Sequence, residues 1–168
     1  AGKGKAIGCG GVDAVVDCLR VHRVDKNVCH RGCWALANLT VSEAGQVKAI
    51  DCGGVEALVD CLRVHRADPA VCHQGCHALA NLFVSEAGRV EAIGCGGVEA
   101  VLECLRVHRA DKNVCHLGCS ALARLAFGET GQVKSIDNGA PAVIMDCLQL
   151  HPQDSDVTLY GIWALANT

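Results

Sequence analysis

The stretch Cys29–Leu39, Cys-His-Arg-Gly-Cys-Trp-Ala-Leu-Ala-Asn-Leu, decides the fold because the chain repeats it at a fixed interval. Copies recur at Cys72–Leu82 and Cys115–Leu125, and a more divergent copy lies at Thr158–Thr168. Successive copies are 43 residues apart, and the segment 11–53 differs from the next repeat at only 11 of its 43 positions. A period of about 40–47 residues is typical of helical solenoids with two or three helices per repeat. The period therefore predicts an all-α fold.

Each repeat contains three segments with apolar residues at helical spacing, separated by turn residues. The glycine pair that begins at Gly53 is expected to end a helix, with Gly53 in the left-handed conformation. A second helix is expected over 12–23. A third helix is expected over 26–41, with Asp25 as its N-cap, and the short first helix of the next repeat is expected over 42–52. Three helices per repeat are therefore predicted.

The composition indicates the kind of core and argues against some classes of partner. The chain has 168 residues, of which 51% are hydrophobic and 3% aromatic, so the core is expected to consist of small aliphatic residues and cysteine. A net charge of −3 argues against nucleic acid as a partner, since nucleic-acid binding favours a strongly basic face. No apolar run approaches the roughly 18 residues of a membrane span, and Ala1–Lys5 do not begin a secretory signal. A cytoplasmic or nuclear protein is expected.

The 13 cysteines follow the repeat, which indicates local structural roles and reduced thiols rather than a disulfide framework. Cys18 falls in the apolar stripe of its helix, where a free thiol acts as a small hydrophobe. Cys33 is expected in the core, and Cys29 is expected to be partly exposed and oxidisable. The repeated sets are Cys9/52/95, Cys18/61/104/147, Cys29/72/115 and Cys33/76/119.

Three phrases of the repeat carry a resemblance to a known family. They are Val47–Gly54, Val55–Leu62, and Val71–Leu82 with its ending Ala-Leu-Ala-Asn-Leu. In this order they resemble the three helices of the armadillo repeat, and the resemblance covers the whole chain. It implies a right-handed α-solenoid of about four three-helix repeats with a period of 43. The expected repeats are about 1–41, 42–84, 85–127 and 128–168, with the first and last incomplete.

In the armadillo family, the third helices line a concave groove that holds an extended peptide. Groove asparagines bond the peptide backbone, and tryptophans one turn earlier form the walls of side-chain pockets. The matching positions in the four repeats are Trp34/Asn38, His77/Asn81, Ser120/Arg124 and Trp163/Asn167. One turn before them lie His30, His73, His116 and Leu159. Nuclear-import carriers of this family use acidic residues to hold basic cargo. Because this chain has histidine or leucine one turn before the tryptophan positions, the resemblance does not imply that it binds such cargo.

The same residues support a groove on chemical grounds, with alternatives. An asparagine amide can donate and accept at once, as an extended peptide backbone requires. Packed helices about 8–10 Å apart would each serve two or three residues of a strand that rises about 3.3 Å per residue. The alternative is that Asn38, Asn81 and Asn167 brace backbone within the array. The histidines would favour acidic ligands below about pH 6.5, or form a solvated polar face.

Catalysis, metals and cofactors are not expected. His73 and His77 are four residues apart on a helix, but two ligands do not make a zinc site. No oriented nucleophile and base occur together, and no phosphate-binding loop is present. The histidines near the ends of the second helices are expected to stabilise those ends through the helix dipole. They are His22, His65, His108 and His151.

The favoured function is a non-catalytic protein-interaction scaffold that binds an extended peptide or protein segment. The alternative is a structural spacer, either part of a larger protein or a consensus-like designed repeat protein. Neither end carries a polar capping repeat, so end-to-end self-association of copies is expected under this alternative. A redox- or metal-responsive module, suggested by the cysteines and histidines alone, is a third class.

Overall fold

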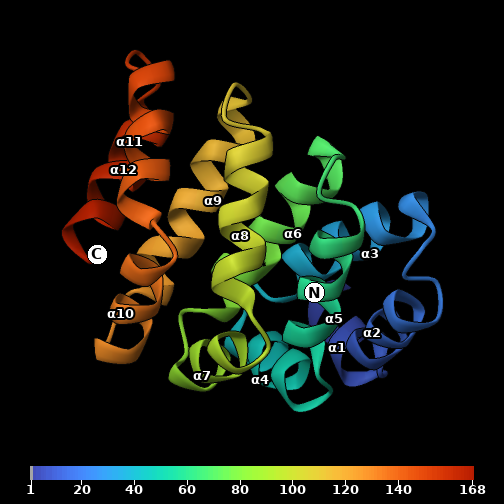
Figure 1. The fold of residues 1–168 in the computed structure, drawn as a ribbon. Helices are drawn as coiled ribbons and strands as arrows, with labels where there is room; N and C mark the ends of the chain where they lie inside the picture. The colour runs from blue at the N-terminus through green and yellow to red at the C-terminus, as the bar shows by residue number, and fades with distance from the viewer. Residues whose placement is uncertain (1) are drawn as a thin grey trace.

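The computed structural model describes residues 2–168, so Ala1, where the predicted array starts, lies outside it. Within this range the chain forms twelve α-helices and no strands, which confirms the all-α class (Figure 1). The first helices of the repeats are α1 (Gly2–Gly8), α4 (Glu43–Asp51), α7 (Glu86–Gly94) and α10 (Glu129–Asp137). The second helices are α2 (Gly11–Val21), α5 (Gly54–Val64), α8 (Gly97–Val107) and α11 (Ala140–Leu150). The third helices are α3 (Lys26–Leu39), α6 (Pro69–Leu82), α9 (Lys112–Leu125) and α12 (Ser155–Ala166).

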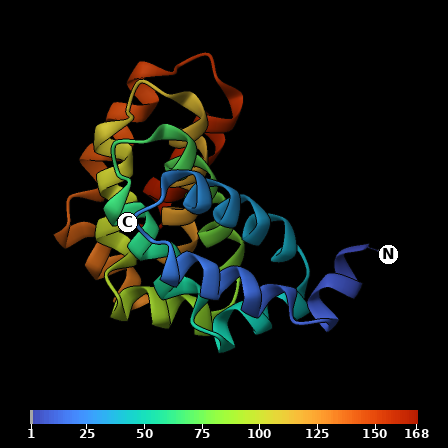
Figure 2. The same cartoon turned by 90° about the vertical axis from the view of Figure 1, so that its right-hand side faces the viewer.

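Helices of the same kind lie side by side along the molecule. The third helices pack in the order α3, α6, α9 and α12, and the second helices pack in the order α2, α5, α8 and α11. The short first helices follow one edge, and the chain advances from one end of the array to the other (Figure 1). Figure 2 shows the end formed by α1, α2 and α3 facing the viewer. This arrangement is compatible with the predicted α-solenoid.

Local sequence determines the helix ends. Asp25 caps α3 by accepting hydrogen bonds from the backbone N–H groups of Asn27 and Val28, as predicted. Gly53 has φ +73°, which confirms the left-handed residue between the first and second helices. The helices α2 and α3 end two residues earlier than predicted, because the chain turns at the C-caps His22 and Thr40.

A glycine in each third helix allows close packing against the second helix. A Cβ atom on Gly75 would lie 2.5 Å from Cδ2 of Leu62, which is too close for any other residue without rearrangement. The same contact recurs at Gly32, Gly118 and Gly161. The second and third helices of a repeat therefore pack as one unit.

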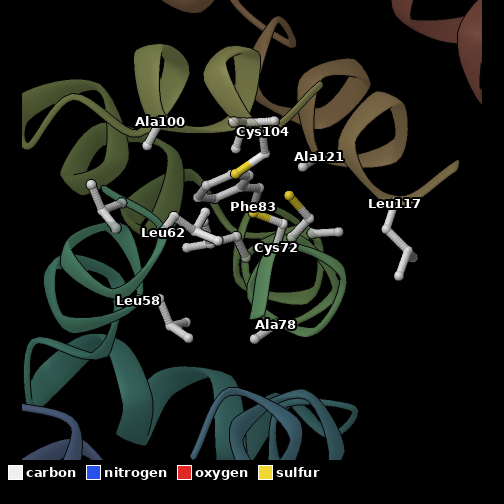
Figure 3. Packing of buried hydrophobic residues seen from close by; sticks show 14 of the residues in the cluster. Leu58, Leu62, Cys72, Ala78, Phe83, Ala100, Cys104, Leu117 and Ala121 are labelled. Atoms are coloured by element: carbon white, nitrogen blue, oxygen red, sulfur yellow. The ribbon is translucent and has the colours of Figure 1, made fainter. Parts of the chain in front are cut away.

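The core runs through the array between the second and third helices. Leu58, Leu62 and Phe83 are fully buried there, together with the thiols of Cys72 and Cys104 (Figure 3). Small side chains and sulfur dominate the rest of this core, as the composition predicted.

Two cysteine predictions are wrong. Cys18 was expected in the apolar stripe but is exposed, whereas its copies Cys61, Cys104 and Cys147 are buried. The reason is that no described repeat precedes α2 to cover it. Cys29 was expected to be partly exposed, but it is fully buried, with its Sγ 3.4 Å from that of Cys61. Burial raises the pKa of Cys29 to about 12, so this thiol is not a reactive one.

Side chains on the second helices join neighbouring repeats. Arg63 Nη2 donates to the carbonyl oxygen of Cys95 at 2.5 Å, and Arg20 and Arg106 make equivalent bonds. His108 Nε2 donates to the carbonyl oxygen of Arg66 in the preceding repeat at 2.8 Å. His65 and His151 make the same bond at 2.9 Å, so these histidines connect neighbouring repeats, a role that the sequence did not predict.

Candidate functional site

The third helices bring the predicted tryptophan positions into one row across the repeats. Trp34 on α3 is 52% exposed and Trp163 on α12 is 39% exposed. Between them, His77 on α6 is partly buried and Ser120 on α9 is buried. The row therefore has an exposed indole in its first and last repeats and smaller groups at its centre.

The asparagines one turn later differ in what they bond. Asn81 Nδ2 donates to the carbonyl oxygen of Ala37 on the preceding third helix at 3.0 Å, and Asn167 makes the equivalent bond at 2.9 Å. No repeat precedes Asn38 among the described residues, and its Nδ2 donates to the carbonyl oxygen of Trp34 at 2.9 Å. Asn81 and Asn167 thus bond backbone of the preceding repeat. This is the alternative role that the sequence left open for them. Within residues 2–168, none of the three Oδ1 atoms accepts a hydrogen bond.

The histidines one turn earlier lie near one another on α3, α6 and α9. Burial lowers the pKa of His73 below the ordinary histidine value, and the charges of His116 and His30 lower it further. Burial also lowers the pKa of His77, to which neighbouring basic groups contribute. Gln74 Nε2 lies 3.1 Å from His73 Nδ1. His73 and His77 are therefore neutral at pH 7 and gain positive charge only in more acidic solution.

The third repeat departs from the others and forms a different local structure. Arg124 Nη1 donates to Ser120 Oγ at 2.6 Å, and the guanidinium carbon lies 5.6 Å from the ring centroid of Trp163. Tyr160 lies between two groove positions, with ring centroids 4.9 Å from His116 and 6.1 Å from Trp163. Tyr160 was not among the predicted site residues. The sequence does contain a signal for it, because the preceding repeats carry nonaromatic residues at the equivalent position.

A pocket of about 290 Å³ lies across the C-terminal ends of α6 and α9 and beside α12. It is lined by Phe83, Val84, Arg89, Arg124, Phe127 and Trp163. Arg124 and Trp163 were predicted as site residues, whereas Phe83, Arg89 and Phe127 were missed. Comparison with their repeat equivalents could have found them, because each differs from the residue that the neighbouring repeats carry.

The described residues offer no centre for metal chemistry. Among residues 2–168, no three His, Cys, Asp or Glu side chains are placed to hold one metal ion, so the pair His73 and His77 gains no third ligand. In the same range, every helix is too short or too polar to cross a membrane.

No protein family matches the sequence of this chain, and no curated protein matches it.

Proposed function

We propose that this chain is an armadillo-type scaffold that binds an extended peptide along the row of third helices and catalyses no reaction. The observation that carries the proposal is the exposure of Trp34 and Trp163 in one row of otherwise closely packed helices. Exposed indoles on a surface with few other aromatic groups are typical anchors for a partner, because tryptophan is enriched among residues that dominate binding energy.

The asparagines support the proposal in a modified form. The Nδ2 groups of Asn81 and Asn167 already bond the preceding helix, which leaves their Oδ1 atoms to accept hydrogen bonds. An extended peptide presents backbone N–H groups that could donate to these acceptors. The array therefore holds the amides in place before a ligand arrives, which reduces the entropy lost on binding.

Selection from a random peptide library tests this function. The variant Trp34→Ala/Asn38→Ala removes an exposed anchor and an amide that bonds only its own helix, so the fold should persist. We expect one extended motif to be enriched by the unmodified chain and to bind the variant at least tenfold more weakly. Truncation of an anchor that dominates an interface typically costs about 2 kcal/mol or more of binding free energy, and about 1.4 kcal/mol corresponds to a tenfold change.

Val107→Ala is the matched control, because Val107 is 45% exposed on a second helix and lies outside the row. Circular dichroism should show equal helix content in all three proteins. Equal affinity of the double variant and the unmodified chain would contradict binding along this row. So would the absence of any enriched motif with folded protein.

A second candidate function, the self-stacking spacer, is favoured by the two ends of the array. Ala14 and Cys18 are exposed on α2, whereas the equivalent Ala57 and Cys61 on α5 are buried. At the other end Ile162 is 58% exposed, although its equivalents in the other third helices are fully buried cysteines. Each end thus exposes side chains whose equivalents are covered by a neighbouring repeat inside the array. The partner that fits each end is therefore the opposite end of a second copy.

A further inference from the structure

Departures from the repeat converge on one pocket. The chain carries arginine at position 89, where the neighbouring repeats have Gln46 and Gln132, and at position 124, where the others have asparagine. Phe83 replaces Thr40 and Ala126, and Phe127 replaces Val41 and Val84. All four replaced residues line the pocket of about 290 Å³ between α6, α9 and α12. Two added charges and two added aromatic rings therefore meet at a single place.

Both guanidinium groups are held by neutral neighbours. Arg89 Nη1 donates to the carbonyl oxygens of Phe83 and Val84 at 3.1 Å each, and its guanidinium carbon lies 5.5 Å from the Phe127 ring centroid. Arg124 donates to the Ser120 hydroxyl and lies over the ring of Trp163. Ser120 takes the place of the tryptophan or histidine in the other repeats, which makes room for this side chain. Each arginine is thus fixed in position and retains further N–H donors.

The pocket carries positive charge without a counterion from the chain. Within residues 2–168, neither Arg89 nor Arg124 lies within 4.0 Å of a carboxylate oxygen, although seven other pairs of basic and acidic residues do. No acidic residue lines the pocket. Partly buried guanidinium groups bind planar or tetrahedral oxyanions through two parallel hydrogen bonds, and such bonds are about twice as strong as neutral ones.

We propose that the pocket formed by Arg89, Arg124, Phe127 and Trp163 binds a side-chain oxyanion, a carboxylate or a phosphate monoester, on the peptide that the row of third helices holds. This inference rests on the proposed function for the peptide, whereas the oxyanion pocket can be tested alone. Phe127 is 64% exposed and Trp163 is 39% exposed, so both rings are available to an apolar stem that carries the charged group. The third repeat thus sets the charge preference of the row.

Small probes test the pocket without a peptide. Phenyl phosphate, benzoate and uncharged benzamide are titrated separately into ¹⁵N-labelled protein, and the indole N–H signals of Trp163 and Trp34 are followed by NMR. We expect phenyl phosphate to shift Trp163 saturably and Trp34 to stay unchanged. A saturable shift with benzoate as well assigns both oxyanions to the pocket, a response to phenyl phosphate alone assigns it to phosphate monoesters, and a response to benzoate alone assigns it to carboxylates. Equal responses to benzamide, or equal shifts of both indoles, overturn the proposal.

The chain supplies its own matched variants. Arg124→Asn and Arg89→Gln each restore the amide that other repeats carry, so folding should be retained. Each variant should bind the charged probe about tenfold or more weakly, since a charge-assisted pair is lost. Arg109→Gln, an exposed change outside the pocket, should bind it as before. Unchanged affinity in both pocket variants contradicts the assignment.

Peptide selection then separates the two proposals. Peptides enriched on the unmodified chain should carry an acidic or phosphorylated residue at a fixed place, and this preference should vanish on Arg124→Asn while the rest of the motif persists. Probe binding without any enriched peptide would overturn peptide binding by the row and leave the oxyanion pocket standing. Enriched peptides with no acidic preference, together with no binding of the small probes, would overturn the oxyanion pocket and leave peptide binding by the row standing.

Discussion

Glu91 lies where the neighbouring repeats carry lysine. Lys48 Nζ pairs with Asp13 at 2.8 Å between the first two repeats, and Lys134 lies 3.9 Å from Glu99 between the last two. At the middle junction the corresponding residues are both acidic, Glu91 and Glu56. Burial raises the pKa of Glu91 and the charge of Glu56 also raises it, whereas a hydrogen bond to the Glu56 backbone and the charge of Arg20 lower it in part. The middle junction therefore contains a repulsion where its neighbours contain an attraction.

Glu91→Lys should stabilise the array. It replaces repulsion between like charges with an ion pair to Glu56, which at a partly exposed site is worth about 0.5–1 kcal/mol in the free energy of unfolding. Urea denaturation at pH 7 measures the change. Glu91→Gln is the control, because it removes the repulsion without adding an attraction and should gain less. If neither Glu91→Lys nor Glu91→Gln is more stable than the unmodified chain, the two carboxylates do not repel each other.

The pH dependence follows from the direction of the shift. The folded chain binds the Glu91 proton more tightly than the unfolded chain does, so this group favours folding below the unfolded glutamate pKa of about 4.3. That contribution is lost as the pH rises through the higher pKa of the folded state. The advantage of Glu91→Gln at pH 7 should accordingly disappear near pH 4. An advantage that is equal at both values would point to packing instead.

Residue identity predicted which positions recur but not where every side chain points. The spacing of Asn81 predicted its place on the third helix, yet its Nδ2 group bonds the preceding helix, because that helix packs close enough to present a free carbonyl group. Periodicity within one helix contains no information on this distance. Hydrogen bonding of Asn81 within the array could therefore be predicted only as one of two alternatives.

At the scale of the helix, Asp111 isolates the contribution of an N-cap. It accepts hydrogen bonds from the backbone N–H groups of Asn113 and Val114 at 2.9 and 3.3 Å. Equivalent aspartates also pair with Lys26 and Lys112, but the residue that would pair with Asp111 is Pro69. Substitution of Asp111 therefore removes the hydrogen bonds of the cap without also removing an ion pair.

Asp111→Ala should lower the free energy of unfolding by about 1 kcal/mol, since the first turn of α9 loses its acceptor. Asp111→Asn should lower it by much less, because an asparagine oxygen can cap the same groups. The midpoint of urea denaturation distinguishes the two variants. Equal losses would mean that the charge of Asp111, rather than its hydrogen bonds, stabilises the helix.

The helices were the most predictable level of this structure. Asp25 and Gly53 determine helix ends through local backbone chemistry, so a single sequence suffices to place them. The predicted ends of α2 and α3 were two residues too late, because His22 and Thr40 are compatible with a helix and only the turn that follows excludes them.

For the whole molecule, the self-stacking that we propose as a second function would join the two unlike ends of the array head to tail. Figure 2 shows the end formed by α1, α2 and α3. A pocket of about 530 Å³ at this end is lined mainly by small and apolar residues of α2 and α3. Ile162 and Met145 are exposed at the other end. An interface between unlike surfaces leaves one end of each outer copy unpaired, so copies add one after another unless the array closes into a ring.

Sedimentation should therefore show a mass that rises with protein concentration. Ala14→Glu blocks one end and Ile162→Glu blocks the other, so each variant alone should be a monomer. An equal mixture of the two should form dimers and nothing larger, because each partner retains one usable end. Val90→Glu, an exposed change on α7, should assemble like the unmodified chain. A concentration-independent monomer of the unmodified chain would exclude self-stacking.

Position in the array explains what the sequence could not predict at this scale. Cys18 has the same neighbours in sequence as Cys61, yet it is exposed because its repeat lacks a predecessor among the described residues. The pocket at Arg89 and Arg124 combines residues from three repeats, so no single motif contains it. Both features depend on how repeats meet, which a search for similarity along the chain does not describe.

The placement of the two tryptophans also has an optical consequence. Trp34 lies in the first third helix and Trp163 in the last, and the chain has no other indole. Intrinsic emission therefore reports on the terminal repeats, whereas far-ultraviolet ellipticity reports on all twelve helices together. Recording both during one melt, with each indole replaced in turn by phenylalanine, would show which end frays first and how far fraying travels before the centre gives way.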